Sequence, residues 1–529
     1  LKCIGLISFR DADERKKIFE LDHIASYPVP EIRQQLVKAG RGNPRLMEAL
    51  NALAGEVKDA EIGKLLSKAK DKRDEFVQEL VLRQLLETQP EAFGTFLRRS
   101  AVYRLPVLEE GIGLVCEGLQ DWESQAEKAV RLSLIEKDST RRDYVRYWVT
   151  PLLREDIFGE LQEEERRKCH EVAVSYYQAK LSASPDYYDP VSGAELIEHA
   201  LKAGLDDIAI EEGGGRFLPY LRDTLAYKEA LAQGKHILSH VSQPKRDDKY
   251  ARFIFEFGWI HYEMGKARES IDYYEQALSI VKVVYGERGS EVATIFNQIG
   301  MAWLTLGEPK KAIGYSKRAL SLDKKVYGEK DRAVARDLNN IGAAWLTLGE
   351  PKKAIGYSKR ALSLDKKLYG EKNPVVATEL NNIGAAWHAL GEHKKAIEYY
   401  EQALSLDKKL YGEKNPDVAR DLNNIGMVWT DLGEHKEAIG YFEQALSIAK
   451  VVYGERHPSV AIKLNNIGLA WNRLRKHKKA IDFFEQALSI DREVFGEVHP
   501  EVAKRLNNIG SAWYLLKDCL LYTSDAADE

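Results

Sequence analysis

Glycine and tryptophan recur at a constant interval of 42 residues along the C-terminal half of the sequence. The period continues over six copies, and a weaker copy begins at Gly258. Segments 300–341 and 342–383 differ at only seven of 42 positions, so one is a recent duplicate of the other. A fixed period of this size is typical of architectures in which each unit packs on its neighbours. The paired positions are Gly300, Gly342, Gly384, Gly426, Gly468 and Gly510 with Trp303, Trp345, Trp387, Trp429, Trp471 and Trp513.

Each copy of the repeat encodes two helices. Leu422 and Trp429 share one helical face, and Gly433 has the position of a C-terminal cap. A second run of apolar residues at helical spacing follows over 438–448, and Pro458 opens the next unit. Because a helix pair of this size cannot bury its apolar faces alone, the pattern predicts a right-handed solenoid of stacked hairpins and a mostly all-α fold class.

The segments LNNIG, LGEHKKAI, EQALS and YGE, repeated in this order, resemble the tetratricopeptide repeat in its kinesin light chain-like class. The resemblance covers residues 251–516. It implies a superhelix in which the first helix of each pair lines a concave groove. It also implies that the ligand is a protein or an extended peptide lying along that groove.

Residues opposite the apolar stripe of each first helix are expected to face this groove. Paired asparagines recur there, and a carboxamide offers both donors and acceptors to the backbone of an extended peptide. The alternative is that one asparagine of each pair bonds to the neighbouring repeat. Basic residues on the same face favour an acidic peptide. The predicted peptide-binding residues are Arg336, Asn339, Asn340, Asn381, Asn382, His388, Arg420, Asn423, Asn424, Asn465, Asn466, Asn472, Lys504 and Asn507.

Composition argues against several other classes of function. The 78 basic and 82 acidic residues give a net charge of −4, which is unlike a dedicated nucleic-acid or membrane-surface binder. No run of 18 apolar residues could span a bilayer. The four cysteines have neither metal-ligand nor disulfide spacing, so the sequence predicts a cytoplasmic protein without a metal site. The lysine pairs that begin second helices, such as Lys352 and Lys353, are expected on a solvated outer face.

The N-terminal half carries shorter signals. Residues 2–9 predict a buried strand, and Pro44 begins a helix after a glycine-containing turn. Residues 129–149 predict a helix, a charged turn and a strand, and Pro151 opens a further helix. Three helices with such a β-hairpin make a winged helix. Gly213–Gly215 predicts a loop or bend.

This order of elements resembles the C-terminal part of a signal-transduction ATPase with NB-ARC and winged-helix modules, over residues 1–180. The resemblance implies that Arg10 senses phosphate and that Pro44 contacts adenine. Thr150 stands where the family has a nucleotide-sensing histidine. No G-x-x-x-x-G-K-[ST] motif is present, so we predict no catalysis and no cofactor in this chain, with ATP or ADP bound by a longer parent protein. The alternative is that 1–180 is only a helical scaffold.

We expect both ends of the chain to be cut. The predicted function is a protein- or peptide-binding sensor of a signal-transduction ATPase, in which a groove ligand shifts the nucleotide module between states. The alternative is a passive adaptor without a nucleotide switch. The predicted domains are 1–75, a remnant of the nucleotide-binding domain and its helical lid; 76–180, the winged helix; 181–250, irregular helical linker pairs; 251–516, the array; and 517–529, a non-native tail.

Overall fold

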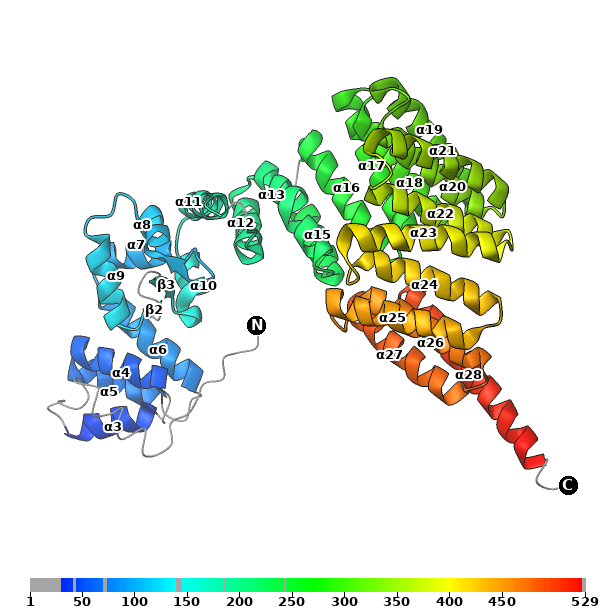
Figure 1. Ribbon diagram of the computed structural model, residues 1–529. Coiled ribbons are helices and arrows are strands. Elements are labelled where there is room, and N and C mark those ends of the chain that lie inside the picture. Colours follow the sequence, from blue (N-terminus) through cyan, green and yellow to red (C-terminus); the bar gives the residue numbers. More distant parts are fainter. Residues whose placement is uncertain are drawn as a thin grey trace. The chain divides into compact units, whose positions relative to one another are not determined.

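The computed structural model of the chain describes residues 30–40, 44–69, 74–138, 145–184, 187–241 and 244–525, and these are mostly helical (Figure 1). The chain divides into two compact units, Leu1–Ala209 and Ile210–Glu529. The predicted strand over 2–9 and Arg10 lie outside the described residues. Among the described helices, none is long and apolar enough to cross a membrane.

Helices also dominate the N-terminal unit. Its first part consists of α3 (Pro30–Gly40), α4 (Pro44–Glu56), α5 (Asp59–Ala69) and α6 (Asp74–Glu87). The central part contains α7 (Glu91–Ser100), β1 (Val107–Leu108), α8 (Glu109–Val115), α9 (Trp122–Arg131), β2 (Ile135–Asp138) and β3 (Arg146–Val149). The last part contains α10 (Pro151–Gly159), α11 (Glu163–Ser182), α12 (Pro190–Ala203) and the start of α13 (Asp206–Glu212).

The three strands form one antiparallel sheet in the order β1-β3-β2. Val149 of β3 lies opposite Ile135 of β2, and both side chains are buried. Of the helix, charged turn and strand predicted over 129–149, the strand is present as β3, which begins at Arg146, whereas the helix ends at Arg131 and β2 occupies Ile135–Asp138. Pro151 occupies the first turn of α10, where its missing N–H costs nothing.

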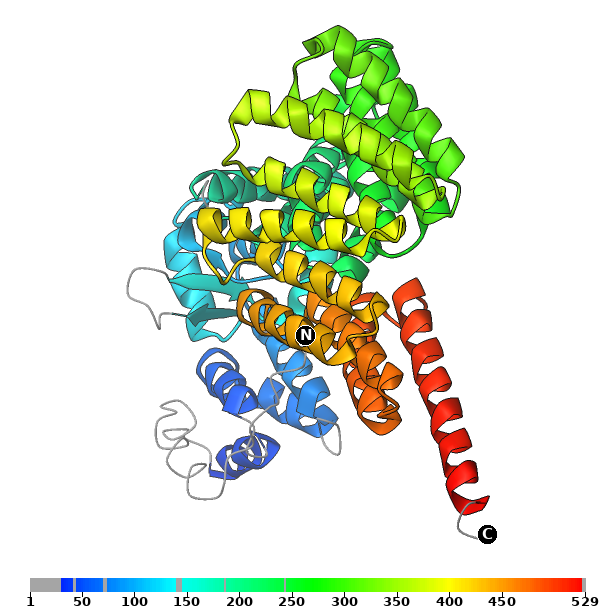
Figure 2. The same ribbon diagram turned by 45° about the vertical axis from the view of Figure 1, so that its right-hand side comes forward.

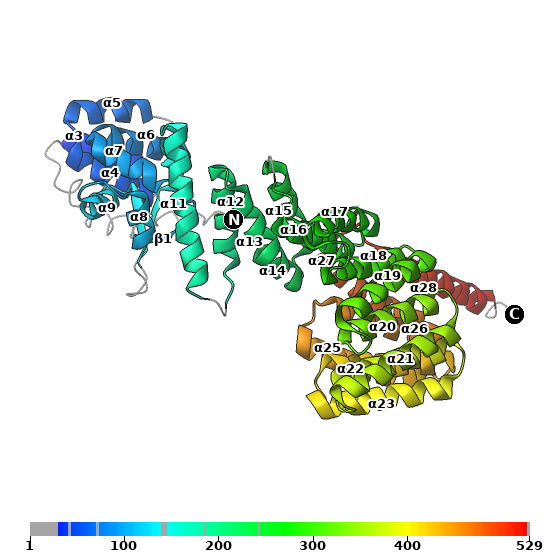
Figure 3. The same cartoon turned by 90° about the horizontal axis from the view of Figure 1, so that it is seen from above.

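The second unit begins within α13, continues through a π-helical turn and then stacks helical hairpins (Figures 1 and 3). Before the array lie η1 (Gly213–Phe217), α14 (Leu218–Asp223) and α15 (Tyr227–His240). The hairpins are α16 (Asp248–Glu263) with α17 (Ala267–Tyr285), α18 (Ser290–Thr305) with α19 (Pro309–Tyr327), α20 (Arg332–Thr347) with α21 (Pro351–Tyr369), α22 (Pro374–Ala389) with α23 (His393–Tyr411), α24 (Pro416–Asp431) with α25 (His435–Tyr453), and α26 (Pro458–Arg473) with α27 (His477–Phe495). Helix α28 (Pro500–Asp525) follows.

Glycine has two separate tasks in each hairpin. Gly433 adopts a φ of +85°, which lets the chain reverse between α24 and α25 without the steric cost that a side chain would add. Gly426 lies inside α24, where a Cβ atom would come within 2.7 Å of the Phe442 ring. The glycine therefore allows the ring of the second helix to pack directly on the backbone of the first.

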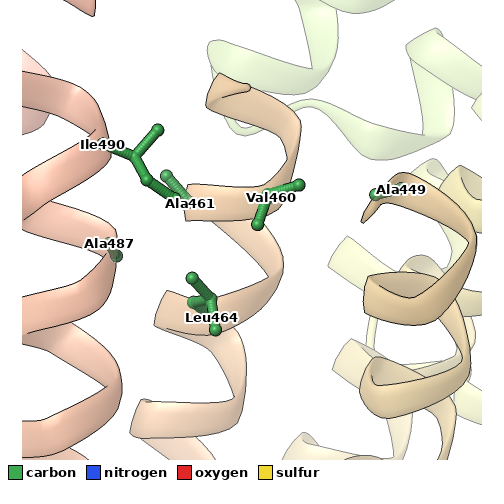
Figure 4. Packing of buried hydrophobic residues seen from close by; sticks show 6 residues of the cluster. All are labelled: Ala449, Val460, Ala461, Leu464, Ala487 and Ile490. Atoms are coloured by element: carbon green, nitrogen blue, oxygen red, sulfur yellow. The ribbon is translucent and has the colours of Figure 1, made fainter. Parts of the chain in front are cut away.

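Small and branched apolar side chains fill the junctions between hairpins. Val460 and Leu464 of α26 are at most 3% exposed and lie between Ala449 of α25 and Ala487 of α27 (Figure 4). Each hairpin thus supplies half of a core that only its neighbour completes. This packing explains why the repeat pattern predicts the array so well.

The glycine run 213–215 is helical, so the prediction of a loop or bend is wrong. It forms the π-helical turn η1, which continues into α14. A Cβ atom on Gly214 would stand 2.5 Å from the Cα of Phe253, and one on Gly213 would stand 2.9 Å from Ile237. These glycines are present because α16 passes directly over the backbone of the turn. Sequence alone cannot distinguish such close packing from flexibility.

Two neighbouring glycines provide a test of this explanation. Gly214→Ala is expected to lower the free energy of unfolding of the second unit by about 1–3 kcal/mol, since the backbone of Phe253 must move. A Cβ atom on Gly215 would have no neighbour within 4 Å. Gly215→Ala should therefore raise the free energy of unfolding by about 0.5–1 kcal/mol, because alanine favours a helix more than glycine does. Chemical denaturation of both variants measures the difference. Equal effects would contradict the packing explanation.

Candidate peptide-binding groove

The first helices of the hairpins lie on the inner side of the array. Helix α18 contacts α20, α20 contacts α22, and this continues to α28, whereas second helices approach one another less. Figure 2 shows the hairpins stacked in succession, from green to orange. Met427 and Leu469 are at least 40% exposed on these first helices, whose equivalent positions earlier in the array carry Ala343 and Ala385. The same position is Met301 in the repeat before that of Ala343, and Ser511 in the last, so larger apolar side chains occur in some repeats and small side chains in the others.

The paired asparagines form a ladder that joins consecutive repeats. The second asparagine of a pair donates its Nδ2–H to the Oδ1 of the first asparagine in the preceding repeat, over 2.6–3.1 Å. Asn381, Asn423 and Asn465 are at most 7% exposed. The structure thus gives these carboxamides partners in neighbouring repeats, which is the alternative role that the sequence left open. The donor–acceptor pairs are Asn340–Asn297, Asn382–Asn339, Asn424–Asn381, Asn466–Asn423 and Asn508–Asn465.

The predicted cations of the groove also engage the repeat interfaces. The Arg336 guanidinium lies 3.0 Å from Asp323 and 3.5 Å from Asp337. Arg420 makes the equivalent ion pairs two hairpins further on, with Asp407 and Asp421. Both arginine side chains are more than one third exposed, and Arg420 also pairs with Asp417 at 2.7 Å. They are bound to the scaffold yet accessible to a ligand.

The remaining predicted groove residues have local partners or are exposed. His388 Nε2 lies 2.8 Å from an Asp431 oxygen. Asn472 Oδ1 lies 2.5 Å from His477 Nδ1, and Lys504 donates to Glu501. Asn507 is exposed, and Asn339 is half-buried. Most of the predicted groove residues therefore have hydrogen-bond partners within the array, and Asn507 is exposed to solvent.

Buried carboxylates recur where the second helix of one hairpin meets the first helix of the next. Asp337 and Asp421 are fully buried, and burial raises the pKa of each carboxyl above its usual range. The interface between them has Asp365 and Glu379, where burial raises the pKa to about 6 and about 8. Thr378 stands there in place of the interface arginine. This junction therefore lacks the arginine–aspartate ion pairs of the other two, and the more distant Arg332 is the cation that partly offsets the raised pKa of Asp365.

A cavity of about 330 Å³ opens at the first of these interfaces. Arg332 and Arg336 of α20 line it together with Tyr327 at the end of α19. Asp331 also borders it but already accepts a hydrogen bond from the backbone of Ala333. Arg332 is exposed and makes no hydrogen bond or ion pair among the described residues. The cavity thus presents the guanidinium groups of Arg332 and Arg336 together with the carboxyl groups of Asp323 and Asp331, and the charge of Arg332 also acts on the buried Asp365.

Arg332 was missed by the sequence analysis, although a signal for it exists. The first position of the helix is proline in each later repeat, at Pro374, Pro416, Pro458 and Pro500. All these repeats have the same length, so a cation at a position where the later copies have proline distinguishes the copy that contains Arg332. Only the structure shows that this position lies at the mouth of a cavity.

The second helices carry a separate repeated contact on the outer side. Lys353 lies 4.3 Å from the centre of the Trp345 ring and 3.5 Å from Glu350. Lys311 and Lys395 make the same contact with their tryptophans. The lysines predicted to be solvated are thus half-exposed residues whose stems cover the tryptophan faces. This arrangement is structural, because it repeats in successive hairpins.

The positions with an implied nucleotide role belong to the N-terminal unit. Pro44 begins α4, and the placement of its side chain and of Arg10 is outside the described part of the chain. Thr150 is 4% exposed and donates its hydroxyl proton to the Ser133 carbonyl. Its hydroxyl therefore joins the end of β3 to the segment between α9 and β2. Within the described residues no cluster of three or more metal-ligating side chains occurs.

Comparisons with known proteins follow the same division of the chain. A family model for the tetratricopeptide repeat matches residues 250–325, 291–367, 375–450, 422–493 and 459–519. No curated protein matches the sequence. Among solved structures, the chain is similar to a signal transduction ATPase with numerous domains from Pyrococcus horikoshii, which has a tetratricopeptide repeat sensor. The identity is 15%, the TM-score is 0.52, and the match covers 97% of this chain and 74% of that chain.

Two further solved structures match with lower TM-scores. One is a putative kinesin light chain with nearly identical repeats from Podosopora anserina, at 16% identity and a TM-score of 0.32, covering 39% of this chain and 96% of that chain. The other is a Rap protein in complex with competence and sporulation factor, at 13% identity and a TM-score of 0.40, covering 67% and 94%. At these identities the likenesses concern the fold.

Proposed function

Because the C-terminal half of the chain is an array of tetratricopeptide repeats, we propose that it binds an extended acidic peptide or protein segment in its concave groove. The observation that carries this proposal is the cavity beside Arg332, which is lined by residues of α18, α19 and the start of α20. A carboxylate placed there meets the exposed Arg332 guanidinium, which makes no hydrogen bond or close ion pair among the described residues but shares the cavity with Asp323 and Asp331. The half-exposed Arg336 lies beside it, and Arg420, which is paired with Asp407, Asp417 and Asp421, occupies the equivalent position two hairpins further on.

The array would act as the sensor of a cytoplasmic signal-transduction ATPase. Two features support this reading, namely the winged-helix order of α7, β1, α8, α9, β2 and β3, and the fold likeness over 97% of the chain. In this proposal, a ligand in the groove binds more tightly to the array when the nucleotide module is in one of its two states. Ligand binding therefore raises the population of that state. Arg10 and Pro44 would belong to that module.

Charge reversal at the cavity tests the peptide site. The full chain is screened against an array of synthetic peptides that differ only in their Asp and Glu content. Arg332→Glu is expected to weaken capture of acidic peptides by about tenfold or more, because one charge-assisted hydrogen bond becomes a repulsion. Lys352→Glu makes the same charge change on an exposed position of a second helix and should leave capture unchanged. Equal losses in both variants would contradict a specific site.

A passive adaptor is the second candidate, since an array of this kind binds partners without any nucleotide switch. The two candidates differ in one measurement on the parent protein. If an acidic peptide changes the rate of nucleotide turnover, and Arg332→Glu abolishes that change, the sensor function holds. Unchanged turnover together with intact peptide binding would favour the adaptor. A Walker lysine encoded upstream of Leu1 is the prerequisite for this experiment.

A further inference from the structure

The two ends of the array touch each other. Helix α15 lies against α27, although more than 230 residues separate them. Lys228 Nζ donates to the Glu493 carbonyl over 3.4 Å, and His499 Nε2 lies 3.3 Å from the Glu263 carbonyl. These contacts lie entirely within the unit Ile210–Glu529. The succession of hairpins therefore completes one turn, and its last loop meets the elements before and within the first hairpin.

An aromatic stack forms the centre of this contact. The Tyr227 ring lies parallel to Phe495, with 6.0 Å between ring centres, and Phe495 lies in turn on His499 at 4.2 Å. The Nδ1 of His499 accepts from the Glu501 backbone, so its Nε2 carries the proton donated to the Glu263 carbonyl. Tyr227 is only 6% exposed as a result.

The other repeats serve as internal controls for this contact. The residue equivalent to Phe495 is a tyrosine in every earlier repeat, and each of these tyrosines is 41–49% exposed. Phe495 is half-buried because Tyr227 covers it. Tyr453 stacks on His457 at 4.1 Å in the same way, yet no third ring lies over that pair in the described structure. The equivalent tyrosines are Tyr285, Tyr327, Tyr369, Tyr411 and Tyr453.

A glycine shows how closely the two ends approach. Gly265 follows α16 with a φ of +71°, and a Cβ atom built on it would come within 2.6 Å of Pro500 at the start of α28. Gly307 has the same role after α18, with a φ of +74°, and a Cβ atom there would meet nothing within 4 Å. The first repeat is thus the copy in which the turn glycine faces another part of the chain.

We propose that these residues form a clasp, made of Tyr227, Lys228, Gly265, Phe495 and His499, that closes the array into a ring and sets the width of its groove. The clasp consists of two hydrogen bonds and one aromatic stack, whereas consecutive hairpins share buried apolar cores. The clasp is therefore the joint at which the ring opens first. The inference concerns the unit Ile210–Glu529 alone and does not depend on the identity of the ligand of the array.

Distance measurements on the full chain test the clasp. Spin labels are attached at Glu229→Cys and Val498→Cys, which are exposed positions on the two sides, after Cys3 and Cys519 are replaced by serine. The remaining cysteines are buried. Pulsed dipolar spectroscopy should give one short, narrow distance for a closed ring. A broad distribution at long distances in this labelled protein would overturn the proposal.

A matched pair of glycine variants then separates the clasp from backbone strain. Gly265→Ala and Gly307→Ala suffer the same penalty at positive φ, but only the first presses a methyl group into Pro500. Gly265→Ala is expected to raise the open fraction roughly tenfold, and Gly307→Ala should leave the distances unchanged. Identical distance distributions in the two variants would overturn the proposal.

A second pair keeps the test valid if Gly265→Ala does not fold. Phe495→Ala removes a ring that Tyr227 covers, and Tyr453→Ala removes the equivalent ring from an uncovered loop. Only Phe495→Ala should lengthen the distance between the labels. The same lengthening in Tyr453→Ala, or none in Phe495→Ala, would contradict the clasp.

Discussion

Replacing Glu379 by glutamine is expected to raise the free energy of unfolding of the array by roughly 3 kcal/mol at pH 8. Glu379 is 2% exposed, and Asp365 in the preceding hairpin is fully buried. Both oxygens of Asp365 and the Oε2 of Glu379 have no hydrogen-bond partner among the described residues. Burial, with the nearby Asp365 charge, raises the pKa of Glu379 to about 8. A carboxamide removes one of the two charges, and its Nε2–H group is a donor for the other.

The pH dependence of this effect has a definite sign. A glutamate in an unfolded chain has a pKa near 4.3, so between about pH 4 and pH 8 the folded array binds a proton that the unfolded chain releases. The contribution of this proton to the free energy of unfolding of the array is therefore complete at low pH and falls as the pH rises toward 8. Denaturant unfolding at pH 6 and pH 8 should show this fall in the parent protein and a smaller fall in Glu379→Gln. A steeper fall of the free energy of unfolding in Glu379→Gln than in the parent protein would contradict the assignment of this pH dependence to Glu379.

Two further substitutions make the test specific. Glu401→Gln changes an exposed glutamate of α23 and should alter stability by no more than about 0.5 kcal/mol. Thr378→Arg supplies the guanidinium that Arg336 and Arg420 provide at the flanking interfaces. It should also stabilise the array at pH 8. Because both changes relieve the same repulsion, Thr378→Arg combined with Glu379→Gln should gain less than the sum of the two.

The repeat pattern predicts local structure well because each helix is determined within a few residues. The positions of Gly433, of Pro458 and of the apolar stripe around Leu422 are sufficient to place both helices of a hairpin and their boundaries. The N-terminal elements around Pro151 are predicted for the same reason. In each case the signal and the structure lie in the same short segment.

Contacts between distant segments are what the sequence could not predict. The clasp joins Tyr227 to Phe495, and its existence depends on small rotations that accumulate over six hairpins. The hydrogen-bond partners of the asparagines lie about one repeat away. A ladder of asparagines that bond to one another and a row of asparagines that bind a ligand would therefore show the same periodic sequence pattern. From the sequence, the glycines at 213–215 indicate a turn. Their role in close packing becomes clear only when the position of α16 against them is known.

Acidification from pH 7 to pH 5 is expected to destabilise the unit Leu1–Ala209 by about 4 kcal/mol, which is opposite in direction to the array. His170 of α11 and His199 of α12 are at most 6% exposed, and their Nδ1 atoms lie 2.8 Å apart. Only one of the two can donate to the other, so the pair is suited to neutral imidazoles. Burial lowers the pKa of His170 to about 4 and holds that of His199 well below its usual range.

The charges around the histidine pair act mainly in the same direction. Arg104 and Lys202 disfavour a protonated imidazole at either position, whereas Glu198 opposes them at His170. Arg104 is paired with Glu195 at 2.8 Å, which reduces the influence of that carboxylate on the rings. A free histidine has a pKa near 6.5, so below that pH the unfolded chain takes up protons that the folded unit does not. Stability is thus complete above pH 6.5 and is lost as the pH falls.

His199→Phe tests this mechanism because phenylalanine preserves the ring that stacks on Tyr177 at 5.7 Å while removing the titrating group. The loss of stability between pH 7 and pH 5 should fall by about half, that is by about 2 kcal/mol, since one of two histidines remains. Hydrogen exchange followed by mass spectrometry reports the stability of each unit separately within one molecule. The array is then the internal control, because it should gain stability over the same pH range. If both units lost stability together, neither buried group would be setting the response to pH.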